Sequence, residues 1–172
     1  MTELFLAPAS RRDDAFEIFH RTVLNGIERA TYSNYSDSNW GDYASIWGLT
    51  SSFESSWQNV HRGDWILFYT DSDQYEYAAK VAEKEHNPPL GDAIRTDLLN
   101  VKGNGDRDWD FLLVLENPVS VSISGHKLAD LLDYGNYYPV RFIRVTESRM
   151  EHLREEYNSV NEFIQKIRTD TT

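Results

Sequence analysis

The chain has 172 residues, of which 40% are hydrophobic, which is enough for one compact domain with a buried core. It contains no cysteine, which excludes disulfides, zinc fingers and thiol catalysis, and no apolar run long enough to span a membrane. The first residues lack the basic and apolar regions of a signal peptide, so we expect an intracellular, cytoplasmic protein. We predict a single domain over residues 1–168, with residues 169–172 as a tail or linker stub.

Acidic residues exceed basic ones by 28 to 17 and give the chain a formal charge of −11. This balance argues against a protein that grips the phosphate backbone of a nucleic acid. An excess of carboxylates with few lysines is also typical of proteins adapted to high salt, and a halophilic source remains one of two open interpretations. The net charge therefore does not identify a partner.

The first half of the chain predicts a strand, a helix and a loop. The strand at residues 4–6 ends at Pro8, and a capping-box pattern then begins a helix over about residues 11–25. Residues 30–42 form a polar loop with several large rings, which we interpret as a recognition loop rather than solvated surface. Residues 51–58 predict a short helix.

The middle of the chain predicts a hairpin. Residues 64–70 are a short apolar run, Tyr75, Tyr77, Ala79 and Val81 fall on alternate positions of residues 75–81, and the four residues 71–74 between the two runs are polar. Trp47 precedes this hairpin and is followed by Gly48, where the missing side chain allows the backbone to lie close to a neighbouring group.

The second half predicts further strands and helices around one curved sheet, in an α+β fold. Two prolines and several glycines mark residues 84–110 as a long irregular loop. The elements predicted after this loop are strands at 111–116, 119–123 and 140–145, a short helix capped by Ser124, and a C-terminal helix over about 150–167 that is interrupted near 158–159.

No pattern in the chain predicts catalysis. The five histidines lie in separate predicted elements without metal-ligand spacing, and the carboxylates are best interpreted as a solvated acidic face. The sequence lacks a nucleophile elbow, a phosphate-binding loop and a dinucleotide fingerprint. We therefore expect a protein that is not an enzyme and that holds no metal or cofactor.

The remaining feature of the sequence that suggests a function is its set of tryptophans. We assign Trp57 and Trp65 mainly to the core or to the rim of a pocket, because tryptophan is most often structural. Trp47, beside Gly48, is interpreted as a ligand platform. A flat ring that stacks on a planar group, with an amide such as that of Asn34 reading its edge, is how a flipped base is held.

The order of these segments resembles the YTH domain, and the opening of the chain is equally similar to the EVE domains of prokaryotes. Both families belong to the PUA-like superfamily. The segments that carry the resemblance are Leu4 to Pro8, Tyr32-Ser33-Asn34, Trp47, Arg62-Gly63-Asp64, and the runs 65–70, 75–81 and 111–145.

This resemblance implies a PUA-like, EVE/YTH-like fold with a curved mixed sheet or small barrel, flanking helices and a pocket for a modified base. Trp47 matches the first wall of the pocket, Trp109 is the candidate second wall, and Asn34 matches the amide that contacts the base edge. The remaining residues placed at the pocket are Tyr32, Ser33 and Trp57, and the candidates for backbone contacts are Arg62, Arg95 and Arg107.

The resemblance also implies a function. Prokaryotic modules of this kind are similar to the specificity domains of modification-dependent restriction systems of the McrBC type, so we expect a module that binds methylated DNA by flipping N6-methyladenine or a 5-substituted cytosine. A restriction motor or nuclease would then be a partner. The alternatives are a PUA-type RNA-binding or RNA-modification accessory domain, and an interaction domain whose tryptophans all lie in the core.

Overall fold

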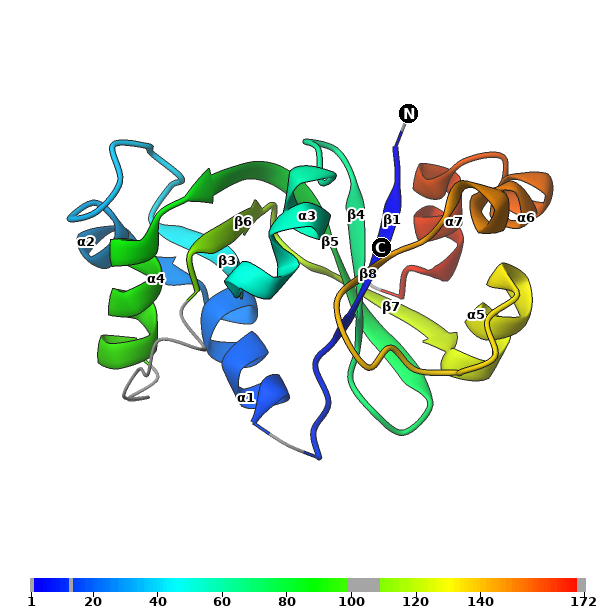
Figure 1. Ribbon diagram of the computed structural model, residues 1–172. Helices are drawn as coiled ribbons and strands as arrows, with labels where there is room; N and C mark the ends of the chain where they lie inside the picture. Colours follow the sequence, from blue (N-terminus) through cyan, green and yellow to red (C-terminus); the bar gives the residue numbers. More distant parts are fainter. Residues whose placement is uncertain (1, 13, 99–108, 170–172) are drawn as a thin grey trace. The chain divides into compact units, whose positions relative to one another are not determined.

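A computed structural model describes residues 2–12, 14–98 and 109–169 of the chain. Helices and strands are interspersed along the chain and the strands pair both parallel and antiparallel, so the predicted α+β class is confirmed (Figure 1). The contacts of the chain group into two compact units, and the single domain over residues 1–168 stays a prediction. Unit 1 comprises residues 1–16, 63–80 and 118–172, and unit 2 comprises residues 17–62 and 81–117.

The sheet of unit 1 is centred on two buried strands. β1, Leu4–Pro8, runs parallel to β4, Trp65–Tyr69, and antiparallel to the short β8, Ile143–Arg144. β4 also pairs antiparallel with the first half of β5, Gln74–His86, which in turn pairs with β7, Val119–Ser124. Every residue of β4 is buried. The continuous apolar run in the sequence thus corresponds to a strand covered on both faces.

Three helices complete unit 1: α5, Gly125–Leu132, α6, Glu147–Tyr157, and α7, Val160–Ile167. Ser124 and Ser159 cap α5 and α7, because each hydroxyl accepts a hydrogen bond from the backbone N–H three residues on. The apolar faces of the three helices pack with β1 and β4 into one core. Within the described residues, no helix combines the length and the apolarity that crossing a membrane would require.

The turn between β4 and β5 is tightly wound. Asp71, Ser72 and Asp73 have φ angles of 85°, 54° and 57°, in the left-handed region that residues other than glycine rarely adopt. Hydrogen bonds to Asp73 hold this conformation. Its Oδ1 accepts from the backbone N–H of His126 at 3.0 Å and lies 2.8 Å from His126 Nδ1, and its own N–H donates to the Tyr69 hydroxyl at 3.1 Å.

We expect this turn to loosen in acid. Burial, the largest influence, raises the pKa of Asp73, but the hydrogen bonds and charge of His126 outweigh it and lower the pKa below 3.8. A lowered carboxyl pKa stabilises the fold above the unfolded value of about 3.9, and that stabilisation is lost as the pH falls through the folded value. NMR signals of the turn should shift with a midpoint below 3.8 in the native protein and should lack this step in Asp73→Asn. A midpoint at or above that value would contradict the prediction.

The sheet of unit 2 is antiparallel throughout. β2, Ile27–Glu28, pairs with β3, Tyr43–Leu49; β3 pairs with β6, Phe111–Leu115; and β6 pairs with the second half of β5. Because side chains alternate along a strand, β3 has two faces. We call the face that carries Ala44, Ile46 and Gly48 the Ala44 face, and the one that carries Ser45, Trp47 and Leu49 the Trp47 face.

Short helices cover both faces of this sheet. On the Ala44 face, α2, Arg29–Tyr32, and α4, Pro88–Ala93, contribute Tyr32 and Leu90 to a buried cluster with Ile46. The elements on the Trp47 face are α1, Ala15–Phe19, its π-helical continuation η1, His20–Leu24, and α3, Glu54–Gln58, which follows the short 3-10 turn η2, Ser51–Phe53.

The structure differs from the sequence prediction in the long loop over residues 84–110. β5 continues to His86, α4 follows, and a π-helix, η3, occupies Ile94–Leu98. Two prolines favour an irregular chain in the sequence, but the first turn of a helix tolerates proline because its N–H groups have no partner within the helix. The Asn87 side chain accepts a hydrogen bond from the N–H of Leu90 and caps this helix.

Two other predicted elements are shorter than expected. The strand predicted at 140–145 is limited to β8, and the helix predicted over 11–25 is α1 with η1. β3 was not predicted as a strand at all. The hairpin of β4 and β5, the buried strand β6 and the C-terminal helix interrupted at Asn158, where φ is 70°, are confirmed.

Candidate functional site

All six residues predicted to line a base pocket belong to unit 2. Trp47 lies in β3 and is 9% exposed. Its ring meets Phe19 of α1 edge to face, with 6.1 Å between the centroids. Trp47 is therefore largely buried between the sheet and a helix, where little of the ring is open to a ligand.

Trp109 lies on the opposite side of the same strand. A Cβ atom built on Gly48 would come within 2.6 to 2.7 Å of three atoms of the Trp109 indole, so this ring packs directly on the Gly48 backbone. Gly48 belongs to the Ala44 face, whereas Trp47 points to the other face. The two tryptophans therefore do not form facing walls of one pocket, because one strand separates them.

Replacing Gly48 with alanine should displace the Trp109 ring. A new methyl group at 2.6 Å from ring carbons cannot be accommodated without movement, and such overpacking typically lowers the free energy of unfolding by about 1 to 3 kcal/mol. Thermal unfolding followed by circular dichroism measures the loss. In a Trp109→Leu variant, Gly48→Ala should lower the free energy of unfolding by clearly less. An equal loss with and without the Trp109 ring would show that this ring does not obstruct the new methyl group.

Trp57 and Tyr32 have structural partners. The Trp57 indole N–H donates to the backbone oxygen of Leu112 at 3.0 Å, and Lys84 Nζ lies 4.7 Å from the centre of the ring. Tyr32 is fully buried, and its hydroxyl accepts a hydrogen bond from the N–H of Trp40 at 2.9 Å. Both side chains fix neighbouring segments, and their polar groups are used inside the fold.

Ser33 and Asn34 are exposed at the end of α2. The Asn34 Nδ2 donates a hydrogen bond to the backbone oxygen of Ala30 at 2.9 Å, one helical turn back. The amide predicted to read a base edge therefore satisfies a carbonyl of its own helix. Of the predicted pocket residues, Trp47 and Trp109 thus lie on opposite faces of β3.

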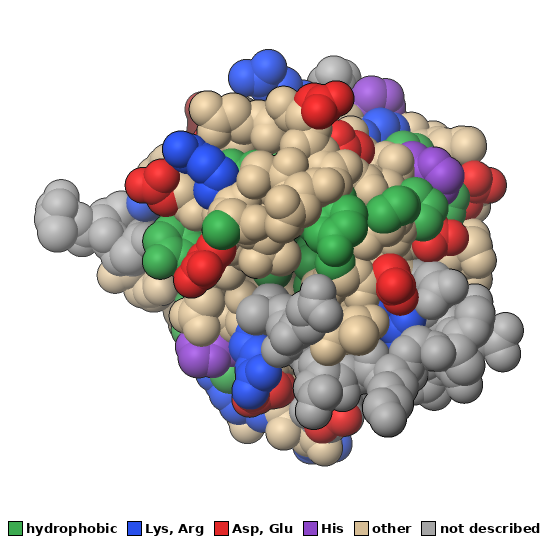
Figure 2. Space-filling model, turned by 90° about the vertical axis from the view of Figure 1, so that its left-hand side faces the viewer, with side chains coloured by type: hydrophobic (Ala, Val, Ile, Leu, Met, Phe, Trp, Pro, Cys, Tyr) green, Lys and Arg blue, Asp and Glu red, His purple; other side chains and the backbone are tan. Residues whose placement is uncertain are grey.

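The arginines predicted to contact a phosphate backbone have different surroundings. Arg62 is exposed. Arg95 is only 3% exposed, which corrects its prediction as a surface contact: the predicted loop is helical here and holds this side chain inside. Arg107 lies outside the described residues. Figure 2 shows the side of the molecule that carries α2 and α4, where basic and acidic side chains of the described residues are interspersed.

A hollow of about 580 Å³ lies in unit 2 and is lined by aromatic, amide and charged side chains. Its lining consists of Asn39, Trp40, Tyr43, Arg62, Ala82, Glu83, Val114, Leu115, Glu116 and Asn117. Tyr43 is 62% exposed, and the Trp40 indole N–H donates to the Glu83 carboxylate at 3.0 Å. We call this cavity the Trp40–Tyr43 hollow.

A bulge in β5 forms one side of the hollow. The register of β5 against β6 shifts between Val81 and Glu83, which leaves Ala82 as the extra residue. Bulges re-aim side chains and are frequent beside functional sites. Here the bulge places Glu83 where its carboxylate meets the Trp40 ring and the Ser38 hydroxyl.

The hollow contains the types of group that the sequence predicted, but from other residues. Rings come from Trp40 and Tyr43 rather than Trp47, and amides come from Asn39 and Asn117 rather than Asn34. Trp40 belongs to the predicted recognition loop. The sequence did not identify Tyr43, the first residue of β3, or Asn117, which follows β6, because only the pairing of these two strands brings the residues to one place.

No three histidine, aspartate or glutamate side chains gather as a metal-binding group anywhere in residues 2–12, 14–98 and 109–169. The arrangement can stack a planar ring on Tyr43, donate hydrogen bonds from the amides and Arg62, and accept them at Glu83 and Glu116. Such a hollow is suited to binding a flat, hydrogen-bonding molecule.

No family model matches the sequence, and no curated protein matches it. Among solved structures, the N-terminal domain of Thermococcus gammatolerans McrB, bound to m5C DNA, is similar with a TM-score of 0.67 and 19% identity, over 91% of this chain and 98% of that one. The YTH domain of Zygosaccharomyces rouxii MRB1, in complex with N6-methyladenosine RNA, has a TM-score of 0.46 and 11% identity, over 90% of this chain and 86% of that one. The chain therefore has the fold of the McrB N-terminal domain, which confirms at the level of fold the predicted resemblance to the DNA-reading modules of McrBC-type systems.

Proposed function

We propose that the chain is a recognition module for methylated DNA that takes a flipped base, N6-methyladenine or a 5-substituted cytosine, into the Trp40–Tyr43 hollow. The observation that supports this most is the likeness to a domain bound to m5C DNA, which extends over 91% of this chain and 98% of that one. The chain itself is proposed to be a binding module. Cleavage of DNA would then be carried out by a motor or nuclease partner.

The hollow has the groups that base flipping requires. Taking a base out of the duplex costs a few kcal/mol, and stacking on one aromatic ring returns about 1 to 3 kcal/mol. Tyr43, with more than half of its surface exposed, is the ring that is open to such stacking. The amides and the carboxylates can pair with the donors and acceptors on the edge of the base.

Arg62 is the cation of the hollow and would contact the DNA backbone. Because the chain carries a net charge of −11, we expect few phosphate contacts and a weak dependence of affinity on salt. Each phosphate contacted adds a slope of about −0.9 to the plot of log affinity against log salt concentration. Arg62→Ala should therefore weaken binding to all duplexes alike and reduce this slope by about one.

The proposal is tested by fluorescence anisotropy with labelled duplexes that carry no modification, N6-methyladenine or 5-methylcytosine. One modified duplex should bind more tightly than the unmodified one. Tyr43→Ala should lower that affinity by about 5- to 100-fold, because it removes one stacking ring.

Tyr35→Ala is the matched control for Tyr43→Ala. Tyr35 is a 43% exposed tyrosine of the same unit that does not line the hollow, so its loss should leave binding unchanged. Equal affinity for all three duplexes would exclude the proposed function. Selective binding that survives Tyr43→Ala but is lost in Trp109→Ala would keep the function and place the base at Trp109 instead.

A further inference from the structure

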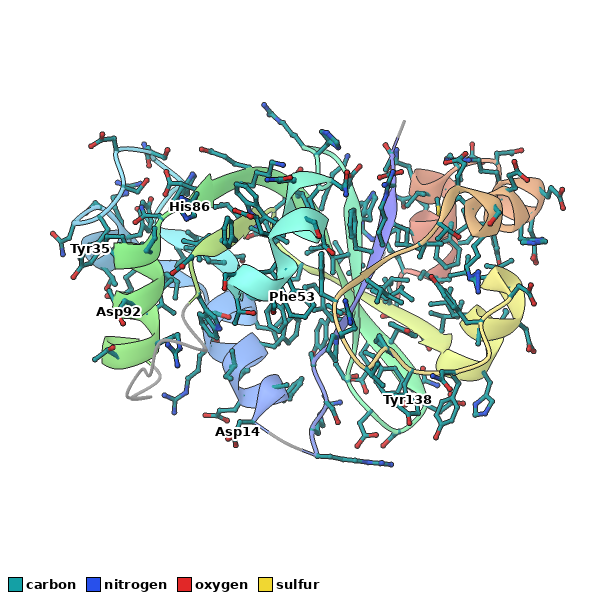
Figure 3. All side chains as sticks on the ribbon, viewed as in Figure 1. Asp14, Tyr35, Phe53, His86, Asp92 and Tyr138 are labelled. Atoms are coloured by element: carbon teal, nitrogen blue, oxygen red, sulfur yellow. The ribbon has the colours of Figure 1, made fainter. Side chains whose placement is uncertain are left out.

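We infer that unit 1 carries a second nucleic-acid site, which stacks an unpaired nucleotide of a DNA strand on Tyr137 and Tyr138. The inference rests on the proposed function for the class of ligand, but it concerns a different unit and different residues. Both tyrosines lie between α5 and β8, and Figure 3 labels Tyr138. They are 36% and 43% exposed, and nearby Val140 is 69% exposed. Neighbouring exposed apolar side chains mark an interaction surface.

The exposed rings belong to a series of aromatic contacts. Tyr137 stacks on His126, with 4.1 Å between the centroids and 13° between the planes, and meets Tyr138 edge to face at 5.0 Å. Tyr138 lies 6.2 Å from the ring of Tyr69. Each exposed ring is thus supported by another ring. Supported rings lose little conformational freedom when a ligand stacks on them.

Asp73 connects the two ends of this series, because it bonds to both His126 and Tyr69. The backbone that carries the two tyrosines is also held in place. A Cβ atom on Gly125 would lie 2.0 Å from the carbonyl oxygen of Tyr137, so the segment that carries the tyrosines packs directly on the first residue of α5. The rings are therefore held in place before any ligand arrives.

A hollow of about 290 Å³ opens beside these rings, and its lining carries a positive charge although the chain as a whole is acidic. Its lining includes Tyr134, Asn136, Tyr137, Tyr138 and Arg141. Among the described residues that line it, the arginine is the only charged one, although the chain has 28 acidic and 17 basic residues. A ligand with a negative charge meets no carboxylate there.

A second hollow, of about 340 Å³, shares Tyr137 and Tyr138 with the first and adds Arg12 and Asp71. Arg12 Nε lies 2.8 Å from the Asp71 carboxylate, but the arginine side chain is 80% exposed. The Asp71 side chain is 14% exposed, so the mostly exposed arginine side chain is the part of this pair that a phosphate can approach. Each hollow therefore combines the same rings with one arginine.

Rings with neighbouring arginines fit a ligand that has a flat, uncharged face and a negative charge. A nucleotide in a single strand has both, and proteins that bind single strands use this combination of stacking rings and cations. A base paired in a duplex does not expose its face. The site is therefore expected to take a nucleotide that has lost its partner, as next to a flipped base.

The test uses the full chain and a labelled oligothymidylate, followed by fluorescence anisotropy. Tyr137→Ala and Tyr138→Ala should each weaken binding by about 5- to 100-fold, because each removes a stacking ring. Tyr138→Phe keeps the ring and should bind within about twofold of the native protein. Tyr35→Ala controls for the loss of an exposed tyrosine elsewhere, and circular dichroism confirms that each variant is folded.

Two results would overturn the inference. One is an oligothymidylate affinity that is absent or that is unchanged in both alanine variants. The other is free thymidine monophosphate competing as well as the oligonucleotide, which would make the site one for free nucleotides rather than a DNA strand. Selectivity for methylated duplexes is measured separately through Tyr43→Ala. If the protein binds single strands through Tyr137 and Tyr138 but does not prefer methylated duplexes, only the proposed function is refuted. If it prefers methylated duplexes but does not bind single strands through these tyrosines, only this inference is refuted.

Discussion

Gly91→Ala is expected to lower the free energy of unfolding by about 3 kcal/mol or more, at the upper end of the cost of overpacking. Gly91 lies in α4, and a Cβ atom there would be 1.7 Å from the backbone oxygen of Trp109 and 2.7 Å from its carbonyl carbon. Neither is the flexible end of a side chain, so α4 and the segment at Trp109 would have to separate. Helix propensity alone predicts the opposite sign, because alanine favours a helix over glycine by about 1 kcal/mol.

Urea unfolding of the native protein and the variant measures this change, and Gly135→Ala is the matched control. No heavy atom lies within 4 Å of the position of a Cβ on Gly135, so that substitution should change stability by no more than about 0.5 kcal/mol. A Gly91→Ala variant as stable as Gly135→Ala would show that α4 and Trp109 do not pack as closely as described.

Tyr32→Ala should lower the free energy of unfolding by about 3 to 5 kcal/mol, as expected when a large buried aromatic side chain is truncated. Tyr32 is 0% exposed and its ring lies 4.9 Å from that of Trp40. Its hydroxyl also accepts from the Trp40 N–H and donates to the backbone oxygen of Gly41. Removal of the side chain thus empties part of the core and releases the segment that holds Trp40.

Tyr32→Phe separates these two effects. Phenylalanine fills the core but leaves the N–H of Trp40 and the oxygen of Gly41 without this partner, which should cost about 1 to 3 kcal/mol. If the Trp40–Tyr43 hollow binds a base, this variant should also bind the modified duplex more weakly while remaining folded. A phenylalanine variant as unstable as the alanine variant would show that the hydroxyl, rather than the ring volume, dominates.

Local patterns in the sequence were sufficient to predict several helices and strands. The hairpin of β4 and β5 is visible from an apolar run, an alternating run and a polar turn between them. Ser124 was identified as a helix cap because its side chain acts on a residue three positions away. Such features depend on neighbours in the chain, and they need no knowledge of the rest of the fold.

The candidate site could not be predicted in the same way. Trp47 is flanked by Ile46 and Gly48, so the alternation that would identify β3 as a strand is obscured by apolar residues on both of its faces. Without that strand, nothing in the sequence shows that Trp47 and Trp109 point to opposite sides. The burial of Arg95 likewise depends on a helix that two prolines concealed.

The division of the chain into two units has a consequence for its synthesis. The chain enters unit 2 after residue 16, leaves it after residue 62, returns at residue 81 and leaves again after residue 117. All of unit 2 therefore exists as polypeptide before β7 and the three helices of unit 1 have been made. β1 is translated before unit 2 but must wait for β4, because Leu4 pairs with Trp65. Since chains fold from the N-terminal end as they emerge, unit 2 is in a position to form before unit 1, and β1 is among the last strands to gain its full set of neighbours, because it also pairs with β8.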